Sequence, residues 1–237
     1  MPKKEKLDKE ENKEKKEKRE KNLNKGIINR QLMIILLGMG ALIIIFLISS
    51  AVFQSLNKFE YNGLTFTKEK FGQIPVYHYY YFLKSKQGQL IKYNLYLRID
   101  PRKNNVSVDG EILLKDDRSV YLSINTTGLT QCEYNAASIA SLSSFLAGNQ
   151  FKVRGASPDE KEASDNNIWY ATCEKWPSDT VILIQDGEST RIVRDNENCY
   201  RIEVANCEIL DAVEKFQTQS IIDARERLGL SSNTTSA

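Results

Sequence analysis

Apolar residues gather in one uninterrupted run near the start of the chain, residues 32–53 (LMIILLGMGALIIIFLISSAVF). The run holds no charged side chain, and its only polar side chains are Ser49 and Ser50. As a helix, this run extends about 33 Å, enough to cross the hydrocarbon layer of a bilayer. The pattern predicts a transmembrane helix over residues 31–54, preceded by a charged tail, residues 1–30.

The chain beyond this run begins with patterns that are typical of strands. Apolar and polar side chains alternate along residues 90–100, the two-residue period of a strand with one packed face and one solvent-exposed face. Asn62-Gly63, between two short extended runs, predicts a tight hairpin turn. Further strands are predicted at residues 76–82, 106–108, 111–114 and 120–124. These segments predict a small antiparallel sheet within a β-rich region, residues 55–127.

Aromatic residues fill the predicted strand at residues 76–82. The residues on one face are Tyr77, Tyr79 and Tyr81, and those on the other are Val76, His78, Tyr80 and Phe82. Tyrosine favours strands and stacks on side chains of neighbouring strands, so we interpret these aromatic residues as structural, packed within the sheet. The alternative is an exposed tyrosine stripe that binds a glycan or a partner protein.

Helical and extended segments alternate in the second half of the chain. Helical spacing over residues 132–148, stopped by Gly148, and a strand at residues 151–155 predict a β-α-β unit. Pro158 is expected at the first position of a short helix that ends near Asp165. A meander of strands is then predicted at residues 168–172, 180–185, 190–193 and 200–204.

The last predicted helix runs from Cys207 to Leu228. The predicted fold class is therefore α+β or α/β. After the transmembrane helix, an antiparallel β region precedes a two-layer α/β domain, residues 128–230, that ends in a helix. Residues 231–237 are expected to form a flexible tail.

Charge is distributed unevenly about the apolar run. Residues 1–30 hold 12 Lys or Arg and 7 Asp or Glu, a net charge of +5, whereas the rest of the chain carries −3. Because positive residues are retained in the cytoplasm, the tail should lie inside and residues from about 55 onward outside the cell membrane. The tail is too polar to bury a core, so we expect it to be disordered or a solvated helix. Contact of its bases with anionic headgroups is the alternative.

Other interpretations of the N-terminus remain open. Ser49-Ser50-Ala51 could be the cleavage site of a secretory signal, although the apolar core and the charged leader are long for one. Lys25-Gly26 could be an archaeal prepilin processing site, although Asn29 and Arg30 interrupt the apolar run that should follow. A lipoprotein is excluded because no cysteine precedes Cys132.

Four cysteines lie on the predicted outer side: Cys132, Cys173, Cys199 and Cys207. An even number in an oxidising compartment predicts two disulfides. Cys199 and Cys207 are too far apart to pair if the residues between them are extended. Cys132 and Cys173 follow strands that are expected to be parallel neighbours, so we favour that pair, with Cys173–Cys199 as the alternative. The spacings of the cysteines do not match those of a zinc site. A redox-active thiol is a further alternative, because Cys132 and Cys207 lie near predicted helix starts.

No catalytic, cofactor-binding or metal-binding motif is recognisable. His78 is the only histidine, and no nucleophile motif accompanies it, so we interpret it as a strand residue. Three acidic clusters are present: Asp116-Asp117, Asp186-Gly187-Glu188 and Asp195 to Asn198. Their composition is typical of turns, and none has the sequence pattern of a calcium-binding loop. We therefore expect no cofactor. The slightly acidic outer part gives no support for binding to nucleic acid.

Three N-glycosylation sequons begin at Asn105, Asn125 and Asn233. All three lie on the predicted outer side of the membrane. The segment from Cys132 to NCYRIEVANCEIL (residues 198–210) resembles a group of uncharacterised membrane-anchored proteins from small-genome (DPANN-type) archaea. That group has no assigned activity, so the resemblance implies no functional residue.

The sequence favours a single-pass membrane protein that presents a disulfide-stabilised domain outside the cell. With an anchor and no catalytic motif, we expect a binding or assembly module of the cell envelope, whose partner is an envelope protein or a glycan. An enzyme is not the favoured interpretation. An extracytoplasmic thiol-dependent enzyme and a pilin-like subunit are the alternatives.

Overall fold

The computed structural model describes residues 33, 35–50, 55–85, 87–115 and 118–230. The chain divides into two compact units, Met1–Leu56 and Asn57–Ala237. In the first unit, residues 33 and 35–50 are helical. Within the described part of the chain, no helix has both the length and the apolar character that crossing a membrane requires. The predicted tails, residues 1–30 and 231–237, lie outside the described residues.

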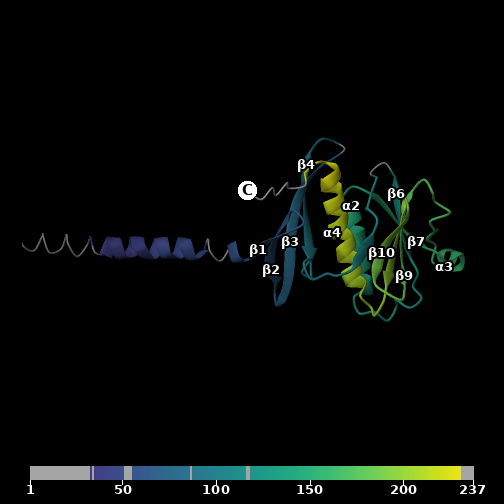
Figure 1. Ribbon diagram of the computed structural model, residues 1–237, viewed down its shortest axis with the longest axis horizontal. Coiled ribbons are helices and arrows are strands. Elements are labelled where there is room, and N and C mark those ends of the chain that lie inside the picture. The colour runs from purple at the N-terminus through teal and green to yellow at the C-terminus, as the bar shows by residue number, and fades with distance from the viewer. Residues whose placement is uncertain (1–32, 34, 51–54, 86, 116–117, 231–237) are drawn as a thin grey trace, which may run out of the picture. The chain divides into compact units, whose positions relative to one another are not determined.

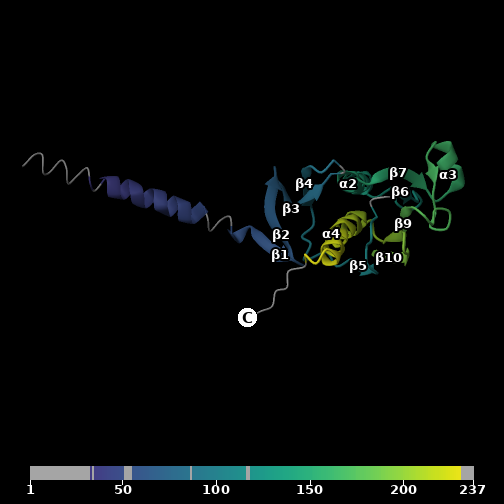
Figure 2. The same cartoon turned by 90° about the horizontal axis from the view of Figure 1, so that it is seen from above.

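The second unit has three layers, with helices packed between two sheets (Figures 1 and 2). The first sheet is antiparallel, with its strands in the order β1-β2-β3-β4. Its strands are β1 (Lys58–Tyr61), β2 (Leu64–Phe71), β3 (Ile74–Lys84) and β4 (Leu90–Leu97). The middle layer holds α2 (Asn135–Gly148) and α4 (Ile209–Arg227), which contact each other.

The second sheet has seven strands in the order β5-β10-β11-β9-β6-β7-β8. Its strands are β5 (Ser107–Asp109), β6 (Ser119–Ile124), β7 (Lys152–Ser157), β8 (Trp169–Tyr170), β9 (Thr180–Asp186), β10 (Arg191–Asn196) and β11 (Cys199–Val204). The five neighbours from β11 to β8 are parallel, and β10 is antiparallel to β11, so the sheet is mixed. The short α3 (Glu160–Asp165) connects β7 to β8.

The α+β class, the four-stranded antiparallel sheet and the C-terminal helix confirm the coarse fold prediction. The mixed sheet and the helices α2 and α4 form the two layers predicted for the α/β domain, and the first sheet packs on the other side of these helices as a third layer. The predicted meander is wrong, since β11 lies between β9 and β10 and pairs in parallel with β9. The predicted strands at residues 106–108 and 120–124 are β5 and β6, and both belong to the mixed sheet.

The first hairpin forms where the Asn-Gly signal predicts it. Asn62 and Gly63 have φ angles of 46° and 75°, the left-handed pair that a two-residue hairpin turn requires. The inner face of this sheet buries Leu64, Phe66 and Tyr79 against the helices. The Tyr79 ring lies 5.5 Å from the ring of Phe66.

Residues 111–114 are not a strand, although the sequence pattern predicts one. Their backbone groups bond to side chains and not to a neighbouring strand. The backbone N–H of Ile112 donates to Asp223 at 2.7 Å, and that of Leu113 donates to the hydroxyl of Tyr200 at 2.7 Å. Apolar alternation alone cannot reveal such partners, because they lie about 90 to 110 residues away in the sequence.

Two helix boundaries have causes other than those that the sequence indicates. Helix α3 begins at Glu160, two residues after the Pro158 that was predicted at its first position. Asp159 caps it, because its carboxylate accepts the backbone N–H of Glu162 at 2.8 Å. Gly148 does end α2, but its φ is not left-handed. A Cβ at Gly148 would collide with the ring of Tyr93, so glycine allows α2 to approach β4.

The helix α4 is buried along most of its length, and it carries polar residues into the core. Glu214 is 4% exposed, and its carboxylate accepts the backbone N–H groups of Arg98 and Ile99 at 2.7 and 2.9 Å. These two donors follow β4, where the chain leaves the first sheet. Burial raises the pKa of Glu214 to about 7, although both hydrogen bonds favour its charged form.

We expect the free energy of unfolding to fall as the pH rises from 4.5 to about 7. A carboxyl with a raised pKa in the folded state holds a proton there that it has already lost in the unfolded state, so rising pH destabilises the fold between the ordinary value of 4.5 and about 7. The Glu214 contribution is up to about 3 kcal/mol. Urea unfolding at several pH values should show this slope, which Glu214→Gln should flatten.

The exposed Glu226 on the same helix provides the control, because Glu226→Gln should leave the slope unchanged. An equal slope in wild type and Glu214→Gln would contradict the assignment.

Candidate functional site

A pocket of about 420 Å³ lies between the four-stranded sheet and the C-terminal half of α4. Its volume falls within the range of small-molecule sites in proteins. The apolar part of its wall includes Leu83 of β3, Phe145 of α2, Ile221 of α4, Leu114 and Phe151. Leu228 also lines the pocket and is 72% exposed, so the pocket reaches the surface.

The unequal lengths of the two core helices explain why space remains here. Cys132 and Cys207, bonded to each other, immediately precede α2 and α4, so both helices begin at the same edge of the second sheet. The helix α2 has 14 residues and α4 has 19, a difference of about 7 Å in length. Beyond Gly148 the middle layer is therefore one helix wide, and pocket residues such as Ala224 and Arg225 lie along the extra length of α4.

Polar groups lie at defined points of this mostly apolar wall. The hydroxyl of Tyr81 donates to Asn149 Oδ1 at 2.6 Å, directly after α2 ends. Burial raises the pKa of Tyr81 well above that of a free phenol, so this hydroxyl remains a neutral donor. Burial also raises the pKa of Tyr79, and the charge and hydrogen bond of Arg225 partly oppose that rise. Tyr79 and Arg225 therefore form a polar pair in the pocket wall.

Both pairs of cysteines form disulfides, Cys132–Cys207 and Cys173–Cys199. The predicted disulfide class is confirmed, but the favoured pair Cys132–Cys173 is wrong. Its premise was that β6 and β8 are neighbours, whereas β7 lies between them. Cys173–Cys199 is the alternative that the sequence left open, and Cys132–Cys207 was not anticipated.

Cys132–Cys207 follows from the parallel strands β6 and β11. Parallel strands end at the same edge of a sheet, so the segments that lead from them into α2 and α4 meet there. Cys173–Cys199 instead belongs to a small apolar cluster with Tyr121 and Val181. That cluster is separate from the main core, to which the helices belong.

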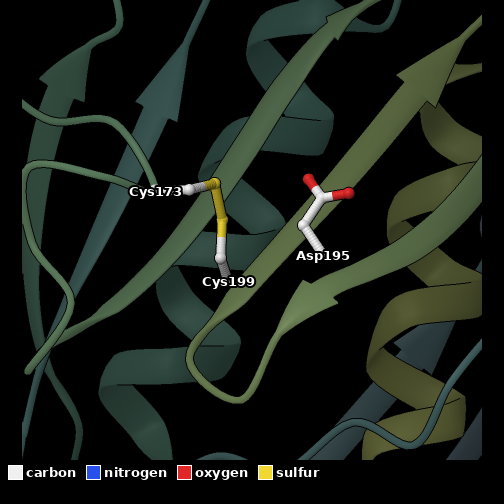
Figure 3. A group of neighbouring side chains, drawn as sticks. All are labelled: Cys173, Asp195 and Cys199. Carbon is white, nitrogen blue, oxygen red and sulfur yellow. A yellow bond between two sulfur atoms is a disulfide. The ribbon is translucent and has the colours of Figure 1, made fainter.

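The group of Cys173, Cys199 and Asp195 places three potential metal ligands within 4.8 Å of one another. Figure 3 shows the two sulfur atoms joined to each other and the Asp195 carboxylate beside them. Because the disulfide uses both sulfur atoms, neither is a thiolate that could bind a metal. The Asp195 carboxylate accepts from Arg201 at 2.8 Å, a cation that opposes metal binding. The group is best explained as structural.

His78 lies on the outer face of the first sheet and has sheet residues as partners. Its Nδ1 is 2.8 Å from Glu69 Oε1, its Nε2 is 3.1 Å from Asn94 Oδ1, and its ring stacks on Tyr96 at 4.5 Å. The same face exposes Tyr80 and Phe82, at 52% and 60%.

The tyrosines of the other face are packed, as the sequence analysis expected. Tyr79 is buried in the core, and Tyr77 and Tyr81 are partly buried against it. The exposed tyrosine stripe that was the alternative does not form from these three residues. The rings that β3 exposes are those of Tyr80 and Phe82.

The acidic clusters that the structure describes act in turns. Gly187 follows β9 where a Cβ would collide with Glu203, and Asn196 Oδ1 accepts the backbone N–H of Asn198 between β10 and β11. The cluster Asp116-Asp117 lies outside the described residues.

Two of the three glycosylation candidates lie in the described chain. Asn105 is exposed, and Asn125 is partly exposed with its side chain accepting the backbone N–H of Thr127 at 3.1 Å. Asn233 lies outside the described residues.

Comparisons with protein-family models, with curated proteins and with solved structures found no match to this chain. Neither Arg225 nor Asn149 carries a sequence signal of a site, and Tyr79 was considered only as part of an exposed stripe. In the sequence, Arg225 is an ordinary base in the last turn of a helix, and no local pattern indicates that it meets a tyrosine 146 positions earlier.

We expect peptide mapping without reduction to recover two linked pairs, Cys132–Cys207 and Cys173–Cys199. Their sequence separations are 75 and 26 residues. In a chain-entropy model, closing these loops stabilises the fold by about 4.5 and about 3.5 kcal/mol. Replacing both cysteines of a pair by serine should lower the free energy of unfolding in that order. A recovered Cys132–Cys173 peptide would contradict the topology.

Proposed function

We propose that this protein is a membrane-anchored binding module, whose folded unit Asn57–Ala237 lies outside the cell membrane and binds an apolar small molecule. The observation that carries the proposal is the pocket beneath β3, an apolar space of about 420 Å³ with a few convergent polar groups. Sites for small molecules usually have this composition and size.

The anchor and the outward orientation are supported by the sequence. Residues 32–53 form an uncharged run long enough to span a bilayer, and the bases before it favour a cytoplasmic N-terminus. Two disulfides are typical of a domain in an oxidising compartment, which is consistent with the same orientation. The sequons at Asn105 and Asn125 also belong to this unit.

Binding explains the site better than thiol chemistry does. All four cysteines are paired, so a thiol nucleophile would require one disulfide to open first. The pocket wall instead offers aliphatic and aromatic surface, which binds ligands by removing apolar area from water.

Protease added to intact cells should digest Asn57–Ala237 and spare a membrane-embedded N-terminal fragment. This is expected because the positively charged tail, residues 1–30, stays in the cytoplasm and leaves the folded unit outside. Immunoblotting of tags at the two termini would distinguish the fragments. If the folded unit is cut only after the cells are opened, the proposed orientation is wrong.

Filling the pocket should abolish ligand binding. Ala224 lines the pocket on α4, so a phenyl ring placed there by Ala224→Phe would occupy the space that the ligand needs. We expect saturable binding of radiolabelled 1-decanol to the full chain in nanodiscs, after subtraction of empty nanodiscs. The variant should weaken this binding at least tenfold.

The matched control is Ala137→Phe, because Ala137 is exposed on α2 and does not line the pocket. Near-ultraviolet circular dichroism should verify that both variants are folded. Unchanged binding in a folded Ala224→Phe protein would overturn the proposed site.

A further inference from the structure

We infer that the ligand of this pocket is an amphipathic anion, a single apolar chain whose carboxylate or phosphate head binds the guanidinium of Arg225. The inference rests on the proposed function and assigns a chemical class to its ligand. It depends on where Arg225 lies, on which partners it has, and on the size of the apolar space beside it.

Among the described residues, the partners of Arg225 include no counterion. Its Nη2 donates to the backbone carbonyl of Leu230 at 2.9 Å, and its guanidinium interacts with the hydroxyl of Tyr79. No carboxylate among the described residues forms an ion pair with it. Arg227, two residues later, pairs with Glu111 at 2.9 Å. A partly buried guanidinium beside apolar surface is stabilised by an anion, and its fork of donors matches a carboxylate or a phosphate.

The rest of the pocket fits the chain of such a ligand. Leu83, Phe145, Phe151 and Ile221 offer apolar surface in the pocket to which Arg225 also belongs. Each methylene that leaves water for such a surface adds to the affinity. Tyr79, as a neutral hydroxyl, is a second donor for the head, since its pKa is raised by burial.

A purely structural role for Arg225 makes a different prediction. Arginine near a helix C-terminus can bond to the last carbonyls while its aliphatic stem covers apolar surface. In that case the charge would not distinguish ligands, and an alcohol would bind as well as an acid of the same length. Ligands that differ only in their heads therefore test the inference.

The test measures saturable binding of radiolabelled decanoate, decyl phosphate and 1-decanol to the full chain in nanodiscs at neutral pH, after subtraction of empty nanodiscs. We expect at least one of the two anions to bind at least tenfold more tightly than 1-decanol. Arg225→Gln should remove that preference, so that neither anion binds more tightly than 1-decanol does to the same variant, whereas Arg225→Lys should keep most of the preference. If only one of the two anions shows a preference that depends on Arg225, that anion identifies the head group of the ligand as a carboxylate or a phosphate.

Arg194→Gln is the matched control, because Arg194 also donates to backbone carbonyls and lies on β10, away from the pocket. It should keep the preference for the anion. Equal binding of acid and alcohol by the wild type, or an undiminished preference in Arg225→Gln, would overturn the inference while the pocket remains a binding site. If neither the anions nor 1-decanol bind, the proposed function fails and the inference fails with it.

Discussion

The fold depends on α4 being enclosed between two sheets. A helix with only one packed face can leave its polar residues in water, but α4 has apolar neighbours on both sides and buries Glu214, Gln217 and Asp223. Buried polar groups must find partners, and these carboxylates find them on the chain that leads from one sheet to the other. The Glu214 carboxylate accepts hydrogen bonds from the backbone N–H groups of Arg98 and Ile99, and the Asp223 carboxylate accepts one from that of Ile112.

This arrangement makes α4 the common support of the unit. In the chain between β4 and β6, four backbone N–H groups donate to side chains of α4 or to Tyr200, and others donate locally to Asp100 and Asn104. A neutral Glu214 is easier to bury than a charged one, while a charged one accepts both hydrogen bonds better. The stability of the unit is therefore coupled to pH near neutrality through one carboxyl group.

The same layer creates the pocket. The two helices start together, tied by Cys132–Cys207, and α2 ends first at Gly148. The close approach of Gly148 to Tyr93 lets α2 lie against the first sheet, and the chain then turns away at Asn149. The last turns of α4 remain with apolar space beside them, and Arg225 brings a charge to that space. Packing that stabilises the fold thus also defines the ligand site that we propose.

The sequence by itself determined those features that depend on neighbouring residues. Asn62-Gly63 specifies a hairpin because its backbone tolerates left-handed φ angles, and alternation in β4 specifies which face packs. The limits of α2 and α4 were predicted within a few residues, since helical periodicity extends over several turns. The even number of cysteines predicted disulfides as a class.

Only the tertiary structure decided strand order, cysteine pairing and the site. Each of these depends on contacts between residues far apart in the chain, such as Cys132 with Cys207 or Tyr79 with Arg225. Placing β7 between β6 and β8 removed the pairing that the local pattern favoured. The pocket follows from the different lengths of two helices packed side by side. Periodicity predicts each helix separately, but the space that one leaves beside the other exists only once both are packed.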